Sequence, residues 1–186
     1  MKKTFYAILV AIVALCLSSC GNSLKDGFDS KMHTIGAAEL GTVEYTITKV
    51  VKADDNADWY KFGDRKILFT VKATMKAGIS IDGPNSYSAQ IDESTKSITL
   101  TLPEPKVLSL NMKAEDTKLE YEQVSITRFD FDNMERNSLL RQAEEDIKND
   151  KSIGILKDAQ DNAEMFFKAM LAQVGFEKIT INFANN

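Results

Sequence analysis

The sequence predicts an α+β fold, with a largely antiparallel sheet, two helices packed on one face of that sheet, and a C-terminal strand. Three observations favour this class. Between residues 43 and 129, apolar residues recur mostly at every second position, as in half-buried strands. From residue 133 to residue 174 they recur at helical spacing, and residues 176–183 return to alternation.

The clearest strand is "RKILFTVKATMKA" at residues 65–77, where Ile67, Phe69 and Val71 alternate with other side chains. The preceding "VEYTITKVV" alternates in the same way, and "KADDNAD" supplies the polar turn between the two strands. Four more strands are expected before the helices, at residues 87–92, 97–103, 106–112 and 118–129. The first two of these predict a hairpin across a short polar connection.

Two helices are expected next. The first begins near Asp132 or Asn133, either of which is a plausible N-cap, and ends near residue 150. The second covers about residues 152–174, and Gly175 follows it where a C-terminal cap favours positive φ. Its apolar stripe comprises Leu156, Ala159, Ala163, Phe166, Phe167, Met170, Leu171 and Val174.

The N-terminus predicts export. Lys2 and Lys3 precede an apolar run at residues 5–17, and these 13 residues are fewer than the ~20 that a membrane-spanning helix needs. The run ends in "LSSC", which resembles the lipobox of bacterial lipoproteins and implies cleavage after residue 19 and acylation of Cys20. The alternative is an ordinary signal peptide that leaves Cys20 as a free thiol.

The predicted organisation is therefore a signal peptide at residues 1–19, a lipid-anchored polar tether at residues 20–36, and one domain at residues 37–186. The predicted location is the bacterial cell envelope, where the covalent acyl anchor would hold the protein to membrane lipid. Asn22 differs from an aspartate retention signal, which favours the outer membrane.

Composition excludes several function classes. The formal charge is −4, and it becomes −6 once residues 1–19, with Lys2 and Lys3 and no acid, are removed. An acidic chain without a run of basic residues is not expected to bind nucleic acid. Because the mature domain would contain no free thiol, cysteine nucleophiles and metal–thiolate sites are excluded, and no cofactor is expected.

Candidate metal ligands are few. His33 is the only histidine, and it falls in the predicted tether rather than on a helix or a strand. Asp54, Asn56 and Asp58 match the first positions of a calcium loop. Trp59 and Arg65 then stand where that loop needs glycine and a bidentate glutamate, so no metal site is predicted.

Two other groups of side chains leave alternatives open. Asp130, Asp132 and Glu135 surround the start of the first predicted helix, where carboxylates suit the helix dipole, although paired carboxylates also serve glycosidases. The "DWYKFG" segment places three aromatic residues beside a turn. They either cap the end of a core or form an exposed recognition patch; the three are Trp59, Tyr60 and Phe62.

Three short segments carry a family resemblance: Ala77-Gly78-Ile79, Leu102-Pro103 and Gly175-Phe176. With their surroundings, from about residue 40 to residue 183, they resemble the uncharacterised bacterial family catalogued as domain of unknown function 4230. Ser80 stands where the family resemblance implies an aspartate. The resemblance implies a fold and a location, and it transfers no catalytic residue.

These observations favour a membrane-anchored binding or assembly module that is not an enzyme and that contacts an unknown envelope protein or ligand. The alternative is a metal-free envelope enzyme, such as a hydrolase that uses carboxylates. That enzyme would need a deep cleft with converging acidic side chains.

Overall fold

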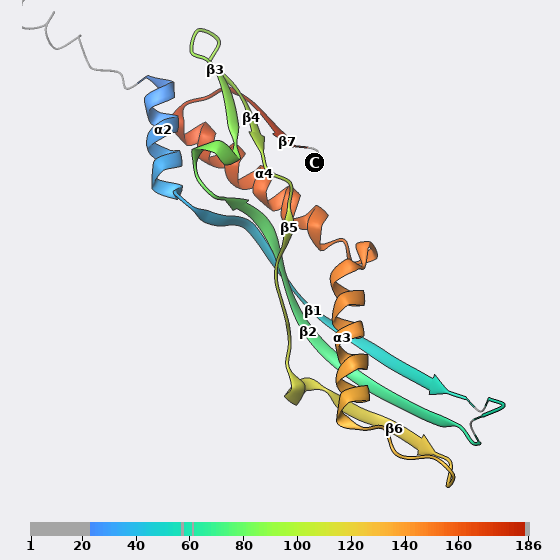
Figure 1. The fold of residues 1–186 in the computed structure, drawn as a ribbon. Coiled ribbons are helices and arrows are strands. Elements are labelled where there is room, and N and C mark those ends of the chain that lie inside the picture. Colours follow the sequence, from blue (N-terminus) through green and yellow to red (C-terminus); the bar gives the residue numbers. More distant parts are fainter. Residues whose placement is uncertain (1–22, 57, 61, 185–186) are drawn as a thin grey trace, which may run out of the picture.

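The computed structural model describes residues 23–184, apart from residues 57 and 61, as an elongated molecule (Figure 1). The α+β class is confirmed. The helices and strands, in chain order, are α2 (Leu24–Ile35), β1 (Ala38–Asp55), β2 (Arg65–Ile81), β3 (Ser88–Asp92), β4 (Ser97–Leu102), β5 (Lys106–Met112), β6 (Lys118–Val124), α3 (Asn133–Asn149), α4 (Ile155–Val174) and β7 (Lys178–Phe183).

Within the described residues the strands form two sheets rather than the single sheet expected. In the larger sheet β1 and β2 pair as a long antiparallel hairpin, from Ala38 opposite Ile81 to Asp55 opposite Arg65. The other edge of β2 pairs with β5 and then, further along, with β6. The smaller sheet has the order β3-β4-β7, and its β4–β7 pairing is parallel.

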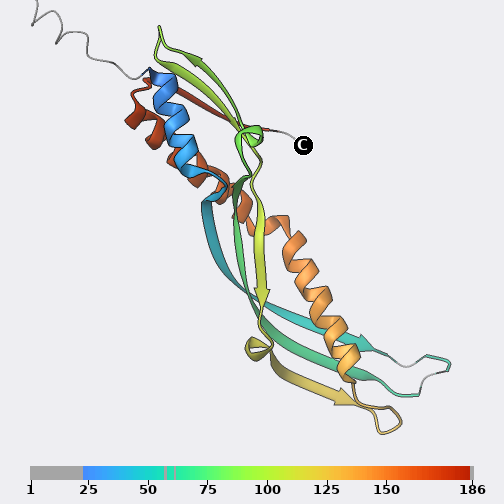
Figure 2. The same ribbon diagram turned by 60° about the vertical axis from the view of Figure 1, so that its left-hand side comes forward.

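The buried hydrophobic residues form two cores, and strand β2 and helix α4 each contribute residues to both. The alternating residues of β2 from Ile67 to Ala77 lie in the core beside α3, whereas Ile79 and Ile81 lie in the core beside α2. Helix α4 contributes Ala159 to the first core and Phe167 to the second. One strand and one helix therefore join the two halves of the molecule (Figure 2).

The expected apolar stripe of α4 is correct at its centre and shifted at its edges. Phe167 and Leu171 are fully buried, but Leu156 and Phe166 are exposed, and Ile155 is buried instead. Where β1 passes α4, Gly41 has φ +61°, and a Cβ there would lie 2.7 Å from the backbone of Ala163. This close approach requires glycine.

The expectation of two helices is wrong, because the described chain contains three. Residues assigned to an irregular tether form α2, which is capped by Ser23 and ends before Gly36 at positive φ. Its buried Phe28 and Met32 are four residues apart and pack in the same core as α4. His33 lies exposed in the last turn of α2, and therefore on a helix.

None of the helices in the described part of the chain combines the length and the apolarity that crossing a membrane requires.

Candidate recognition surface

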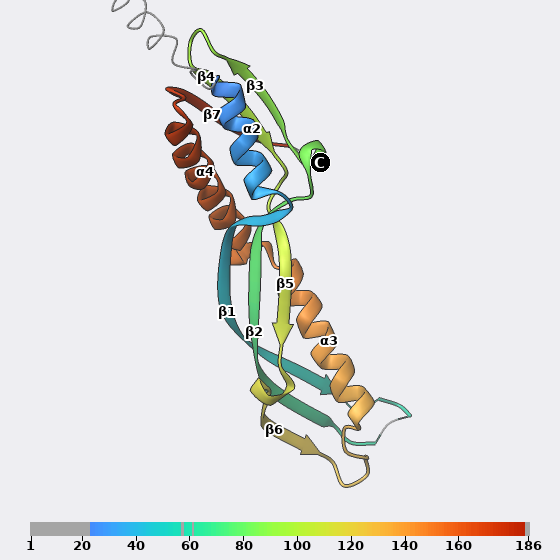
Figure 3. The same cartoon turned by 90° about the vertical axis from the view of Figure 1, so that its left-hand side faces the viewer.

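Two connections meet at the end of the molecule farthest from α2. Residues 56–64 join β1 to β2, and residues 125–132 join β6 to α3 (Figure 3). Ser125 N–H donates to the Asp64 carbonyl at 3.0 Å, and Ser125 Oγ accepts from Asp64 N–H at 2.9 Å. Thr127 Oγ1 donates to the Phe62 carbonyl. These hydrogen bonds hold the two connections side by side.

Gly63 is the point of closest approach between the connections. Its φ is +96°, and a Cβ at this position would lie 2.5 Å from the Ser125 Cβ. For both reasons, any residue other than glycine at position 63 would require one of the connections to shift. The geometry therefore depends on a glycine that lies between the aromatic residues and the start of β2.

A cluster of charged side chains supports the two connections from beneath. Arg65, the first residue of β2, contacts Asp55 and Glu135, each at 2.8 Å. Its guanidinium also lies 4.4 Å from the centre of the Phe131 ring. Arg128 bonds to the same Asp55 carboxylate. The cluster thus joins β1, β2, the second connection and α3.

The contacts within the charged cluster shift the pKa values of Glu135 and Arg65. Hydrogen bonds from Arg65, followed by the Asp132 backbone N–H, hold the pKa of Glu135 below its usual value. The same bond to Glu135, followed by that to Asp55, raises the pKa of Arg65. Both shifts favour the charged forms of Arg65 and Glu135, so their ion pair acts as a fixed part of the scaffold.

The side chains that the scaffold presents are apolar and exposed. Trp59 is 87% exposed, Phe62 77% and Phe129 92%. Trp59 and Tyr60 contact each other edge to face, with ring centres 5.5 Å apart. We call the group the distal patch: Trp59, Tyr60, Phe62, Ile126, Phe129 and Met134.

Three other acidic side chains near the distal patch, those of Asp54, Asp58 and Asp132, have local structural roles. Asp132 accepts from Glu135 N–H, and Glu135 accepts from Asp132 N–H, which forms a capping box at the start of α3. Asp54 pairs with Lys52 at 2.8 Å. Asp58 accepts a hydrogen bond from the Trp59 backbone N–H.

The three side chains that match the first positions of a calcium loop make no common site. Asp54 and Asp58 make the separate contacts just described, and Asn56 is exposed. Among the residues placed by the structure, no group of three or more His, Cys, Asp or Glu side chains could hold a metal ion. Cys20, the predicted lipidation site, lies outside the described residues.

A comparison with known families identifies the chain. A family model described as "Protein of unknown function (DUF4230)" matches residues 36–181. The chain belongs to the DUF4230 family. The match confirms the resemblance inferred from the sequence, and no curated protein or solved structure matches the chain.

The match places both connections of the distal patch inside the DUF4230 region, whereas α2 precedes it. Sequence reasoning identified the first half of this patch, at residues 59–62, and missed the second half. Ile126 and Phe129 were assigned to a strand that ends at Val124 in the structure. The available signal was "ITRF", in which two polar residues separate Ile126 from Phe129 and break the alternation shortly before the N-cap of α3.

Proposed function

We propose that this DUF4230 protein is a non-enzymatic binding module of the bacterial cell envelope, anchored through an acylated Cys20 and recognising an envelope protein through its distal patch. The observation that carries the proposal is the exposure of six large apolar side chains. Five lie on two connections tied together by hydrogen bonds and ion pairs, and the sixth, Met134, lies in the first turn of α3. Apolar residues grouped in this way mark interaction sites on soluble domains.

The position of α2 supports an outward-facing patch. Cys20 precedes Ser23, the N-cap of α2, by three residues, which span at most about 10 Å of extended chain. Because α2 packs on the domain through Phe28 and Met32, a lipid on Cys20 would hold this end of the molecule close to the membrane. The distal connections lie at the opposite end (Figures 1 and 2).

The rigid support of the patch favours binding. Association is opposed by the loss of side-chain and loop freedom, and a preorganised surface loses less. The Arg65 cluster and the Gly63 contact already fix both connections in the free protein. Trp and Tyr are also among the residues that dominate the energy of protein interfaces.

The charges around the patch indicate the chemistry of the partner. Residues 52–65 contain four Asp, two Lys and one Arg, and residues 125–136 contain two Asp, one Glu and two Arg, so each segment carries a formal charge of −1. This acidic surround favours a partner with an apolar pocket rimmed by basic residues. It disfavours pairing with a second copy of the same patch, and it also disfavours an anionic lipid surface.

The carboxylates at the start of α3 do not favour the hydrolase alternative. A glycosidase acid needs a raised pKa so that it can donate a proton near neutral pH. Glu135 has a lowered pKa because Arg65 stabilises its ionised form. Its two oxygens already bond to Arg65 and to the Asp132 N–H.

Metabolic labelling tests the anchor. We expect labelled palmitate to mark the wild-type protein in cells and not the Cys20→Ala variant, because the thiol is the acylation site. Gel fluorography of the purified protein measures this. Equal labelling of both proteins would contradict lipidation at Cys20.

Site-specific crosslinking tests the binding surface. A photoreactive benzoylphenylalanine replaces Phe62 or Phe129 in the full chain, and Lys72 on the exposed face of β2 serves as the matched control position. We expect both patch positions to capture one and the same envelope protein and the control position to capture none of it. Adding Trp59→Ala should reduce capture at Phe129 while the melting temperature stays unchanged.

Two results would overturn the binding proposal. One is capture of the same proteins from Lys72 as from the patch positions. The other is undiminished capture at Phe129 when Trp59 is replaced by alanine. Crosslinks between two copies of the chain would show that the patch mediates self-association and does not bind an envelope protein.

A further inference from the structure

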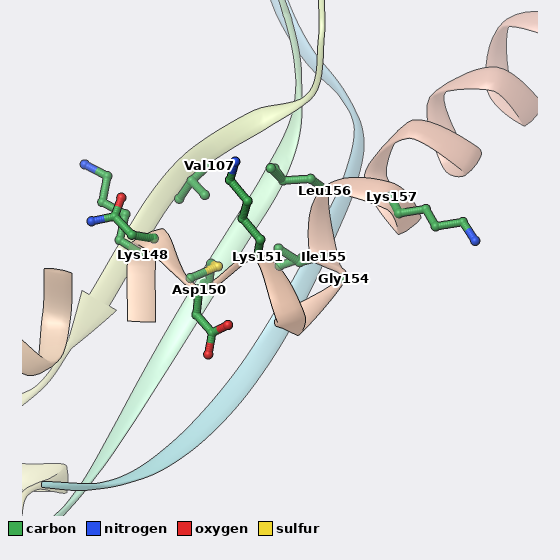
Figure 4. A pocket seen from close by; sticks show the side chains of 10 residues that line it. Val107, Lys148, Asp150, Lys151, Gly154, Ile155, Leu156 and Lys157 are labelled. Atoms are coloured by element: carbon green, nitrogen blue, oxygen red, sulfur yellow. The ribbon is translucent and has the colours of Figure 1, made fainter. Parts of the chain in front are cut away.

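A second candidate site lies near the middle of the molecule, away from the distal patch. It is a hollow of about 410 Å³ between strands β2 and β5 and the connection from α3 to α4 (Figure 4). Its wall is mostly apolar, and it includes Met75, Val107, Ile155 and Leu156. This volume lies within the usual range for small-molecule sites.

The rim of the hollow carries three lysines, at positions 148, 151 and 157. In Figure 4 the side chains of Lys148 and Lys151 extend in the same direction, with Val107 between them, whereas Lys157 points away. Among the ion pairs between described residues, none involves these three lysines. Two ammonium groups therefore stand beside an apolar hollow.

The one carboxylate at the rim is already bonded elsewhere. Asp150 accepts hydrogen bonds from the Ser152 N–H at 2.9 Å and from the Ser152 hydroxyl at 2.6 Å. These bonds lower the pKa of Asp150, and its carboxylate is directed away from Lys148 and Lys151 in Figure 4. It does not neutralise the two lysines.

The apolar wall and the cationic rim together select for one class of ligand. We infer that the hollow binds a small organic anion with an apolar body, such as a medium-chain fatty acid. The hydrocarbon would lie against Met75, Val107 and Leu156, and the carboxylate would bond to Lys148 and Lys151. The backbone N–H groups at the start of α4 add to the positive field, because Gly154 provides no side-chain cap.

Binding of octanoate tests this inference. The full chain, with its own methyl groups labelled for NMR, is incorporated into lipid nanodiscs. Nanodiscs without the protein provide the blank. We expect octanoate to shift the methyl resonances of Met75, Val107 and Leu156. Octanamide, which has the same chain without the charge, should bind about tenfold more weakly, as for loss of a charge-assisted contact.

Matched variants separate the rim from general charge. The double variant Lys148→Gln/Lys151→Gln should bind octanoate about tenfold more weakly, because it loses the contacts to the carboxylate. Lys72→Gln changes a lysine on the exposed face of β2 and should leave the affinity unchanged. Unchanged circular dichroism spectra would establish that both variants are folded.

Three outcomes would overturn the inference: no movement of the three methyl groups at millimolar octanoate, equal affinities for octanoate and octanamide, or equal losses in the double variant and in Lys72→Gln. These outcomes concern a site that shares no residue with the distal patch. Failure here therefore leaves the binding proposal for the patch to its own crosslinking test.

Discussion

At the α2 end, Phe28, Phe167 and Phe176 lie buried in one core, whereas at the opposite end Trp59 and Phe129 are exposed. The α2 end is therefore held together by apolar packing. The distal half has its own core, which includes Ile67 and Phe131, but the two connections beyond that core are held together by ion pairs and hydrogen bonds. Because polar contacts fix the distal connections, their aromatic side chains need not be buried to maintain the fold and are available to a partner.

The largest difference in stability is expected when an aspartate is placed at each end of the molecule. Phe167→Asp should lower the free energy of unfolding by about 4 kcal/mol or more, because it buries an unpaired carboxylate. Trp59→Asp should change it by less than about 0.5 kcal/mol, because the side chain is 87% exposed. Urea unfolding followed by circular dichroism measures both. Similar losses in the two variants would contradict the contrast between the ends.

A smaller effect is expected from breaking the charged cluster. Arg65→Ala leaves Asp55 and Glu135 without their shared partner and should cost about 3 kcal/mol. Lys49→Ala removes a more exposed pair with Asp146 and should cost about 1 kcal/mol or less. The same urea measurement compares them. If both variants lost the same small amount, the cluster would not be what holds the distal end.

Local sequence patterns predicted most of the fold. Alternation in residues 65–77 located the first part of β2, and helical spacing around Phe167 located α4. Helix α2 was missed although Phe28 and Met32 have helical spacing, because its other residues are mostly polar. The second sheet was missed because the parallel pairing of β7 with β4 joins residues about 80 positions apart.

The candidate site was only half predictable for a similar reason. The segment at residues 59–62 drew attention because aromatic residues are unusual beside a turn, but a turn alone does not determine their exposure. Arg65 was noted only as a residue unsuited to a calcium loop. Its true partner Glu135 is 70 residues away, and no short-range pattern indicates that contact.

The smallest expected effect distinguishes how each end holds a carboxylate. At the α2 end, Asp92 accepts hydrogen bonds from Ser94 and Thr95, which lower its pKa to about 2. At the distal end, Arg65 lowers the pKa of Glu135. Both carboxylates therefore contribute stability that is present above their unfolded-state pKa and is lost as the pH falls through the folded-state pKa.

Salt should separate the two carboxylates, because it screens the attraction between Glu135 and the Arg65 guanidinium more than it weakens hydrogen bonds from neighbouring hydroxyls. In a titration followed by carboxyl NMR, added sodium chloride should raise the pKa of Glu135 and leave that of Asp92 at about 2. The control variant Ser94→Ala should raise the Asp92 pKa toward its ordinary value of 3.8 at every salt concentration. Equal salt shifts at both positions would show that the two ends hold their charges by the same means.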